Sequence, residues 1–197
     1  MRTLKLVLLV VLSFAAVNVS AQKKKNKKNK GENASYYETP QMPIDEESKL
    51  ITYQGVIQVP GKNADEIFSM ADKWIMGYFK NASKVVKTKD KAKKRIYASP
   101  RFRVLNPPDK NGKQLMGGIV KYSMILEMKD GRMRYTLYKF HWKQPSYYPI
   151  EKWLQTDSPT YQKRFAYFLQ QVDKEANKVV GDLKKAMKPA EKKSDDW

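Results

Sequence analysis

Alternating apolar and polar positions first appear in the stretch ITYQGVIQV, residues 51–59. A period of two is typical of a strand with one buried face. Asn63, with Glu66 three residues later, then fits the capping box that opens a helix. Apolar side chains recur every three or four residues after it, as on a helix with one buried face. The pattern predicts a strand over residues 51–59 and an amphipathic helix over residues 63–80.

Two shorter strand candidates follow, KVVKTKD and KRIYASPRFRVL, joined by a lysine-rich turn at residues 90–94. Pro100 breaks the second candidate or places it at a sheet edge, because proline cannot donate a hydrogen bond to a neighbouring strand. The longest alternating stretch, IVKYSMILEMKDGRMRYTLYKFHW, is divided by Asp130-Gly131. This dipeptide favours the two-residue type I′ turn of a hairpin. We therefore predict two long antiparallel strands in a fixed register.

The register of this hairpin separates its two faces. Counted outward from the turn, one face holds only apolar pairs and is expected in the core: Met128 with Met133, Leu126 with Tyr135, and Met124 with Leu137. The other face is polar near the turn and aromatic far from it, which is unusual for a surface that only water contacts. Either the loop of residues 144–157 covers its rings, or the face binds a partner. The candidate binding face comprises Ile119, Ile125, Arg134, Tyr138, Phe140 and Trp142.

A second amphipathic helix is predicted after Ser158-Pro159, which fits an N-cap followed by the first helical residue. Its apolar spacing continues until Pro189. The elements follow the order β-α-β-β-β-β-α, so we expect one α+β domain over residues 49–188. It should have an antiparallel sheet of about five strands with helices packed on one face. Residues 189–197 are expected to form a loose tail.

The first 21 residues have the features of a secretory signal peptide. Two early positive charges precede an apolar run, and small residues end at Ala21, where we expect cleavage. No later stretch approaches the length of a membrane span. We therefore expect an exported protein of the periplasm or the medium, without a transmembrane segment after cleavage. Residues 22–48 are polar and rich in Lys and Asn, and they are expected to form a disordered linker.

Positive charge is concentrated in this linker but is not confined to it. The formal net charge is +19, and removing Arg2, Lys5 and the six linker lysines leaves +11 on residues 31–197. Outside the cytoplasm the natural counter-charges are anionic lipids, acidic glycans and acidic proteins, so export argues against a nucleic-acid partner. The linker is either a solvated spacer or a weak contact to an anionic surface. The candidate contacts are Lys23, Lys24, Lys25, Lys27, Lys28 and Lys30.

Few residues offer catalytic or metal-binding chemistry. The chain has no cysteine and a single histidine, His141, which excludes cysteine nucleophiles and sites built from two histidines. By the hairpin register, His141 is expected on the core face. The carboxylates of Asp65 and Glu66 are expected to cap a helix rather than to act as an acid and a base. We predict no catalytic residue, no metal and no cofactor; an enzyme with a dispersed carboxylate or serine site is the alternative.

The strand-helix opening and the hairpin sequence KDGRMRYTL, following a signal peptide, resemble an exported bacterial family. This family is catalogued as domain of unknown function 4468 and described as having a TBP-like fold. The resemblance covers roughly residues 50–142. It implies an antiparallel sheet with helices on one face and a bare curved face on the other. It implies no established activity and no catalytic residue, and a shared fold does not carry function with it.

These observations favour an exported, non-enzymatic binding or accessory module. Its partner would be a protein, peptide or glycan of the cell envelope, held on the outer sheet face. A second class is a polyanion-binding envelope protein, in which the lysines and the basic domain hold anionic lipid, lipopolysaccharide or nucleic acid. The third class is the enzyme named above. The sequence identifies neither a ligand nor a reaction.

Overall fold

The computed structural model describes residues 34–188. The predicted signal peptide, the lysines of residues 22–33 and the tail of residues 189–197 lie outside the described residues. The described part of the chain has an α+β fold, as predicted. Its elements in chain order are η1 (Ala34–Tyr37), β1 (Tyr53–Gln58), α1 (Ala64–Tyr78), α2 (Ala82–Val85), β2 (Val86–Asp90), β3 (Arg95–Ala98), β4 (Arg101–Leu105), β5 (Met116–Lys129), β6 (Arg132–Lys143), β7 (Tyr147–Pro149), η2 (Ile150–Leu154) and α3 (Arg164–Ala186).

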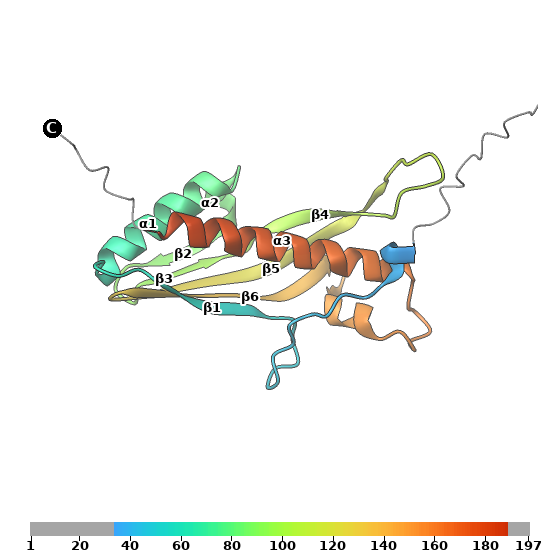
Figure 1. Cartoon of the computed structure of the whole chain (residues 1–197), viewed down its shortest axis with the longest axis horizontal. Helices are drawn as coiled ribbons and strands as arrows, with labels where there is room; N and C mark the ends of the chain where they lie inside the picture. Colours follow the sequence, from blue (N-terminus) through green and yellow to red (C-terminus); the bar gives the residue numbers. More distant parts are fainter. Residues whose placement is uncertain (1–33, 189–197) are drawn as a thin grey trace, which may run out of the picture. The chain divides into compact units, whose positions relative to one another are not determined.

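The sheet of the described residues has seven strands, and each pair of neighbours is antiparallel (Figure 1). Its order is β1-β6-β5-β3-β2, with β4 also paired to β5 and β7 to β6. There are more strands than expected because the break at Pro100 divides one predicted strand into β3 and β4. A short strand, β7, is also added to β6. The long strands β5 and β6 pair with each other and carry most of both faces.

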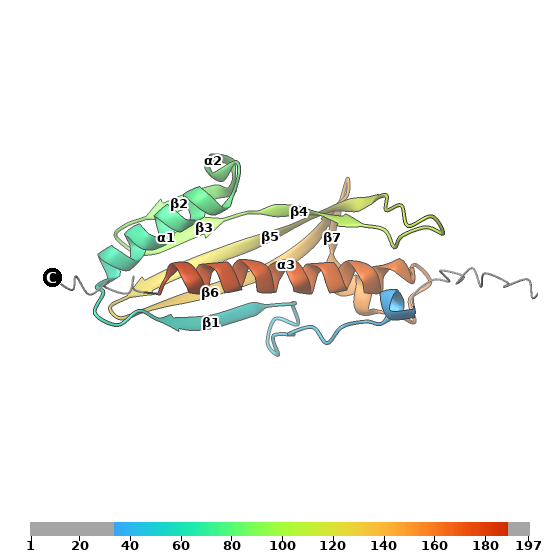
Figure 2. The ribbon, with the colours of Figure 1, turned by 45° about the horizontal axis from the view of Figure 1, so that its top comes forward.

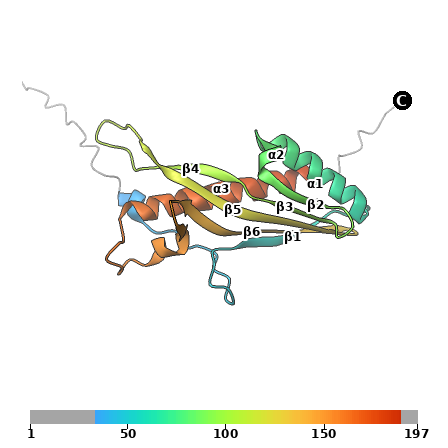
Figure 3. The same cartoon turned by 180° about the vertical axis from the view of Figure 1, so that it is seen from behind.

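Both long helices, α1 and α3, lie on the same face of the sheet, as expected (Figures 1 and 2). Fully buried side chains between the two layers include Ile67 and Ile75 of α1, Leu126 of β5, and Leu169 and Leu183 of α3. Figure 3 shows the sheet from behind, with the strands in front of α3. The face that points away from the helices is called the outer face below.

The predicted capping box at the start of α1 is confirmed. The Glu66 backbone N–H donates to Asn63 Oδ1 at 2.9 Å, and the Asn63 N–H donates to Glu66 Oε2 at 2.9 Å. The Ala64 N–H donates to Asp130 Oδ1 at 2.7 Å, so the carboxylate of the hairpin turn accepts a further bond from the helix start. Both interactions satisfy N–H groups that have no partner inside the helix.

The start of α3 differs from the prediction. Ser158-Pro159 does not begin the helix, which starts at Arg164 instead. The Ser158 hydroxyl lies 3.0 Å from the Thr160 hydroxyl, and the Tyr161 N–H donates to the Ser158 carbonyl at 2.9 Å. Ser158 therefore organises a local turn, which is the usual competitor of helix capping for this residue type.

The ordered chain begins earlier than residue 49, so the predicted linker does not extend to residue 48. The ring centres of Tyr36 and Tyr167 are 4.9 Å apart, which packs η1 against α3. The Gln170 side-chain amide donates to the carbonyl oxygens of Ser35 at 2.6 Å and Glu38 at 2.7 Å. Met42 is also buried. The polar average of the segment concealed these few anchoring side chains.

Within residues 34–188, no helix combines the length and the apolar character that a membrane crossing requires.

Candidate functional site

The hairpin of β5 and β6 forms as predicted from its turn as far as Ser123, which lies opposite Tyr138. The turn itself is not of the predicted type I′, which requires a positive φ at both central residues: Gly131 has a φ of 72°, but Asp130 does not have a positive φ. The two-residue length of the turn, which sets the register, is as predicted. The apolar pairs face the core in the expected register: Met128 with Met133, Leu126 with Tyr135, and Met124 with Leu137.

Beyond Tyr138 a β-bulge changes the register of the hairpin. Tyr122 on β5 faces two residues of β6, Lys139 and Phe140. Lys139 has a φ of 52°, in the left-handed region that one type of bulge requires of its first residue. Because the extra residue is in β6 alone, the alternation of β6 is displaced by one position. Leu137 and Phe140 therefore both face the core.

The prediction that Phe140 and Trp142 lie on the outer face is wrong. Phe140 is fully buried, and Trp142 lies opposite the buried Val120. The ring centre of Trp142 is 5.8 Å from that of Trp153, which belongs to η2 and is fully buried. Counting the alternation without a bulge gave the wrong face. The loop of residues 144–157 does cover Trp142, but it does so on the core side.

The same bulge moves His141 from its expected core position to the outer side, where it lies half-buried opposite Lys121. Its Nδ1 is 3.2 Å from the Lys139 carbonyl oxygen, and its ring centre is 5.1 Å from that of Tyr147. Among the described residues, no serine hydroxyl or carboxylate is hydrogen-bonded to His141. The described part of the chain thus does not assemble a Ser-His-acid arrangement around this ring.

The remaining predicted residues, Ile119, Ile125, Arg134 and Tyr138, do lie on the outer face. Neighbouring strands place further side chains beside them, because residues directly opposite each other share a face. The register puts Arg103 opposite Ile119, Tyr97 opposite Ile125 and Arg101 opposite Lys121. The hairpin register alone did not predict the following members of this face: Arg95, Tyr97, Arg101, Arg103, Lys121 and His141.

At the turn end of the outer face, one carboxylate lies between two arginines. Glu127 Oε2 accepts hydrogen bonds from Arg134 Nη2 at 2.6 Å and Nε at 2.9 Å. Glu127 Oε1 lies 3.9 Å from Arg95 Nε. The arginine side chains stay 60% and 47% exposed, so the ion pairs contribute little stability, about 0–1 kcal/mol each. Because Arg95 and Arg134 share the single negative charge of Glu127, the three side chains together carry one net positive charge.

The middle of the outer face is less charged than its two ends. The hydroxyls of Tyr97 and Ser123 are 3.2 Å apart, and Ile125 lies half-buried beside them. Lys139 Nζ is 5.4 Å from the ring centre of the half-buried Tyr138, within the range of a cation–π contact. These side chains form a floor that offers apolar and aromatic surface together with hydroxyl groups.

The far end of the outer face carries positive charge without an opposing carboxylate. Arg101 and Arg103 are exposed, and Lys121 lies opposite Arg101. Among the described residues, none of these three side chains forms an ion pair within 4.0 Å. Like charges held side by side repel each other and would gain from a bound anion.

A signal for these residues was present in the sequence. In the stretch RIYASPRFRV, Arg95 and Tyr97 alternate with Ile96 and Ala98, and arginines alternate with apolar residues again after Pro100. Both alternations have a polar face, but only strand pairing shows that the two polar faces belong to one surface. The structure supplies that pairing, since β3 and β4 both pair with β5.

Several groups with a shifted pKa lie on the helix side of the sheet instead. Burial raises the pKa of Tyr122, and it raises the pKa of Tyr78 to about 12. Burial and a hydrogen bond donated to Asp173 Oδ1 at 2.8 Å raise the pKa of Tyr53. Shifted pKa values often mark functional sites. Here desolvation is the main cause, so these hydroxyls stay protonated and serve as structural groups.

Hollows of the surface also lie away from the outer face. One of about 740 Å³ is lined by Pro107, Pro108 and Arg164 at the start of α3, and one of about 710 Å³ lies between Trp74 of α1 and Asp182 of α3. A third, of about 390 Å³, lies beside β1. Among the described residues, no group of three or more His, Cys, Asp or Glu side chains could hold a metal ion. The basic and aromatic side chains of the outer face described above line none of these three hollows.

Comparison with known proteins identifies the fold. Residues 53–143 match the model of a family described as "Domain of unknown function (DUF4468) with TBP-like fold". A crystal structure of a DUF4468 family protein from Bacteroides ovatus is similar, with a TM-score of 0.60 and 16% identity over 73% of this chain and 90% of that chain. A TBP-like protein from Parabacteroides distasonis gives a TM-score of 0.56 and 16% identity over 70% of this chain and 92% of that chain.

No curated protein matches the sequence. The solved structures are too distant in sequence to bring more than a fold, whereas the family match covers the strands that form the outer face. Residues 53–143 therefore match the DUF4468 family model, and the protein shares the TBP-like fold of these structures.

Proposed function

We propose that this protein is an exported, non-enzymatic binding module that holds an acidic partner on the outer face of its sheet. The observation that carries the proposal is the uncompensated positive charge of Arg101, Arg103 and Lys121 at one end of that face. Arg95 and Arg134 share a single carboxylate at the other end.

The floor between the two basic ends supports binding of a chain rather than of a small ion. Tyr97, Ile125 and Tyr138 offer flat apolar surface on which a sugar ring or a peptide side chain can lie. Aromatic and arginine side chains are the residue types that dominate many interfaces. A partner with acidic groups spaced along an extended chain fits this arrangement best.

Export is part of the proposal and rests on residues 1–21. Intact-mass spectrometry of the protein recovered from the periplasm or the medium should give a mature chain that starts at Gln22. A chain that retains Met1 would contradict export by this signal.

Retention of the mature chain on immobilised heparin tests the outer face. The variant Arg101→Gln with Arg103→Gln and Lys121→Gln should elute at clearly lower salt than the native chain, because it removes charges from the proposed contact surface. The matched control, Lys174→Gln with Lys178→Gln and Lys185→Gln, removes the same charge from exposed positions of α3.

The two triple variants separate a surface-specific contact from a general effect of charge. Equal shifts in elution would show that retention follows net charge alone, and the proposed site would be wrong. Deletion of residues 22–30 in a third chain measures the contribution of the linker lysines. Its melting temperature should stay within about 1 °C of the native value, since exposed changes usually alter stability by no more than ~0.5 kcal/mol.

A further inference from the structure

We propose that two copies of the chain pair through their β1 strands, in antiparallel orientation, to give a two-fold dimer with one continuous sheet. The inference is independent of the acidic partner, because it rests on the backbone groups of a sheet edge and not on the basic side chains of the outer face. β1 is an edge strand and pairs with β6 alone.

The outward edge of β1 carries unpaired backbone groups. The Val59 N–H donates to the Gly131 carbonyl at 2.8 Å and continues the ladder in which Ile57 lies opposite Met133. In an antiparallel pair, alternate residues bond the neighbouring strand and the residues between them point their N–H and C=O groups away. Gln54, Val56 and Gln58 are the residues between, so their backbone groups point outward.

The two edges of the sheet are protected differently. β2, the opposite edge, contains Lys87, Lys89 and Asp90, and charged side chains are a common protection against edge-to-edge pairing. β1 has the sequence YQGVIQ, without a charge or a proline. Val56 at its centre is 53% exposed although it is a β-branched apolar residue. β1 therefore lacks the usual protection of a solvent-exposed edge.

The free part of the edge has a defined length. At one end, the Thr52 N–H already donates to the Pro43 carbonyl at 2.8 Å, so residue 43 occupies the edge there. At the other end Pro60 follows the strand and cannot donate a backbone hydrogen bond. Three outward residues, Gln54, Val56 and Gln58, remain between these limits.

A two-fold axis through Val56 satisfies all of these groups at once. Val56 then lies opposite its own copy, and Gln54 lies opposite Gln58 of the second copy. Every outward N–H and C=O of the three residues gains a partner. The side chains of the two Val56 residues lie together on one face of the joined sheet and remove each other from water.

The surrounding charges are compatible with this pairing. Antiparallel strands bring the acidic turn of residues 45–47, before one β1, near the end of the other β1, where Lys62 lies. Arg134, opposite Val56 on β6, is one strand removed from the axis. The two copies of Arg134 would be roughly 14 Å apart, beyond the screening length of about 8 Å at physiological salt.

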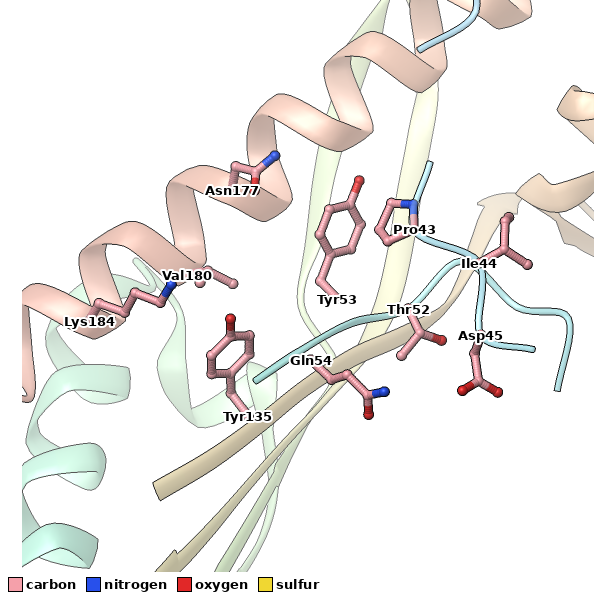
Figure 4. Close-up of a pocket in the computed structure, with 10 residues that line it drawn as sticks. All are labelled: Pro43, Ile44, Asp45, Thr52, Tyr53, Gln54, Tyr135, Asn177, Val180 and Lys184. Carbon is pink, nitrogen blue, oxygen red and sulfur yellow. The ribbon is translucent and has the colours of Figure 1, made fainter. Parts of the chain in front are cut away.

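The open hollow beside β1 borders the same edge. It has a volume of about 390 Å³, and Tyr53 and Tyr135 project from the sheet toward Val180 of α3 (Figure 4). A strand added to β1 would run along the open side of this hollow. Pairing would thus cover apolar surface on both faces of the joined sheet: the Val56 side chains on one face and the hollow on the face that carries α3.

Disulfide trapping in the mature chain tests the pairing and its register, because the native chain has no cysteine. In Val56→Cys the two Cα atoms should be about 5.5 Å apart, within the range of about 4.4–6.8 Å that a disulfide spans. This variant should form a covalent dimer rapidly under mild oxidation. Gln54→Cys should not, because its two copies would be roughly 14 Å apart.

A mixture of Gln54→Cys and Gln58→Cys chains should form the mixed disulfide in preference to either homodimer. Sedimentation equilibrium provides the second measurement. The native chain should dimerise reversibly, and Val56→Lys should be monomeric. At concentrations where the native chain is also monomeric, the two melting temperatures should be equal, because only the dimer contact has been removed. The matched control Met76→Lys replaces an apolar residue of α1 that is 46% exposed and should leave the dimer intact.

Two results would overturn the proposal. One is a native chain that sediments as a monomer at every concentration tested. The other is a Val56→Cys chain that cross-links no faster than Gln54→Cys. Neither result bears on heparin retention, so the dimer and the acidic partner can fail separately.

Discussion

The indole of Trp142 lies directly against the backbone of Gly118. A Cβ atom added to Gly118 would lie 1.9 Å from Trp142 Nε1, and Gly118 has a φ of 147°, where side chains are strained. Gly118→Ala should therefore destabilise the fold by at least about 2 kcal/mol, through both overpacking and backbone strain. Chemical denaturation followed by intrinsic fluorescence measures this change, since Trp142 itself is displaced.

Helical glycines provide the control. Gly77 of α1 and Gly181 of α3 have nothing within 4 Å of an added Cβ atom. Gly181→Ala should raise the free energy of unfolding by about 0.5–1 kcal/mol, the usual gain in a helix interior. Equal effects of Gly118→Ala and Gly181→Ala would contradict the close packing of Trp142 on β5.

The bulge in β6 predicts opposite responses to glycine at two exposed lysines. Lys139 has a φ of 52°, in the left-handed region where a Cβ atom crowds the backbone. Glycine has no Cβ atom, so Lys139→Gly should stabilise the domain by up to about 1 kcal/mol. Lys143→Gly, at an ordinary strand position, should destabilise it by about 0.5–1 kcal/mol. Thermal unfolding of the two variants should shift in opposite directions; a shift in the same direction would argue against the bulge.

Phe140 and Tyr138, two residues apart in β6, should have different roles. Phe140→Ala should lower the free energy of unfolding by about 3–5 kcal/mol, because it opens a cavity in a fully buried site. Tyr138→Ala should cost much less stability but should lower retention on heparin, because the ring belongs to the outer face. A Tyr138→Ala chain with native retention would remove this ring from the proposed contact surface.

The stability of the domain should depend on pH through Glu151. Its Oε1 accepts a hydrogen bond from the Ile51 N–H at 2.9 Å, whereas its Oε2 is buried without a partner. Burial raises the pKa of Glu151 above its ordinary value of 4.5. The folded state therefore holds the proton more tightly than the unfolded state. Stability should fall as the pH rises through the interval from 4.5 to the raised pKa.

Glu151→Gln keeps an oxygen that can accept the Ile51 bond but cannot ionise. The native chain loses stability when Glu151 ionises, whereas the glutamine variant does not. The melting temperature of the variant should therefore rise relative to that of the native chain as the pH is raised from about 4 to about 7. The control Glu46→Gln removes the same charge at an exposed position. The prediction fails when the pH trend of Glu151→Gln does not differ from that of this control.

Local patterns in the sequence predicted much of the fold correctly. The capping box of Asn63 and Glu66 uses groups three residues apart, and the turn at Asp130-Gly131 fixes the register of its nearest pairs. These features depend on short-range geometry, which the order of residues specifies directly. The α+β class and the helices on one face follow from the same periodicities.

The candidate site depended on contacts that local patterns do not contain. The inserted Lys139 moves Phe140 and Trp142 into the core and His141 to the outer face, since one extra residue in a strand inverts every later position. Gly118 has no side chain and so leaves space for the indole of Trp142 in the core. Trp153 of η2 packs against that indole and shields it from water. The sequence by itself determined which residues alternate. Only the tertiary structure decided which face each strand presents, because packing between distant segments selects the bulge and joins Arg101 and Arg103 to the same surface as Tyr138.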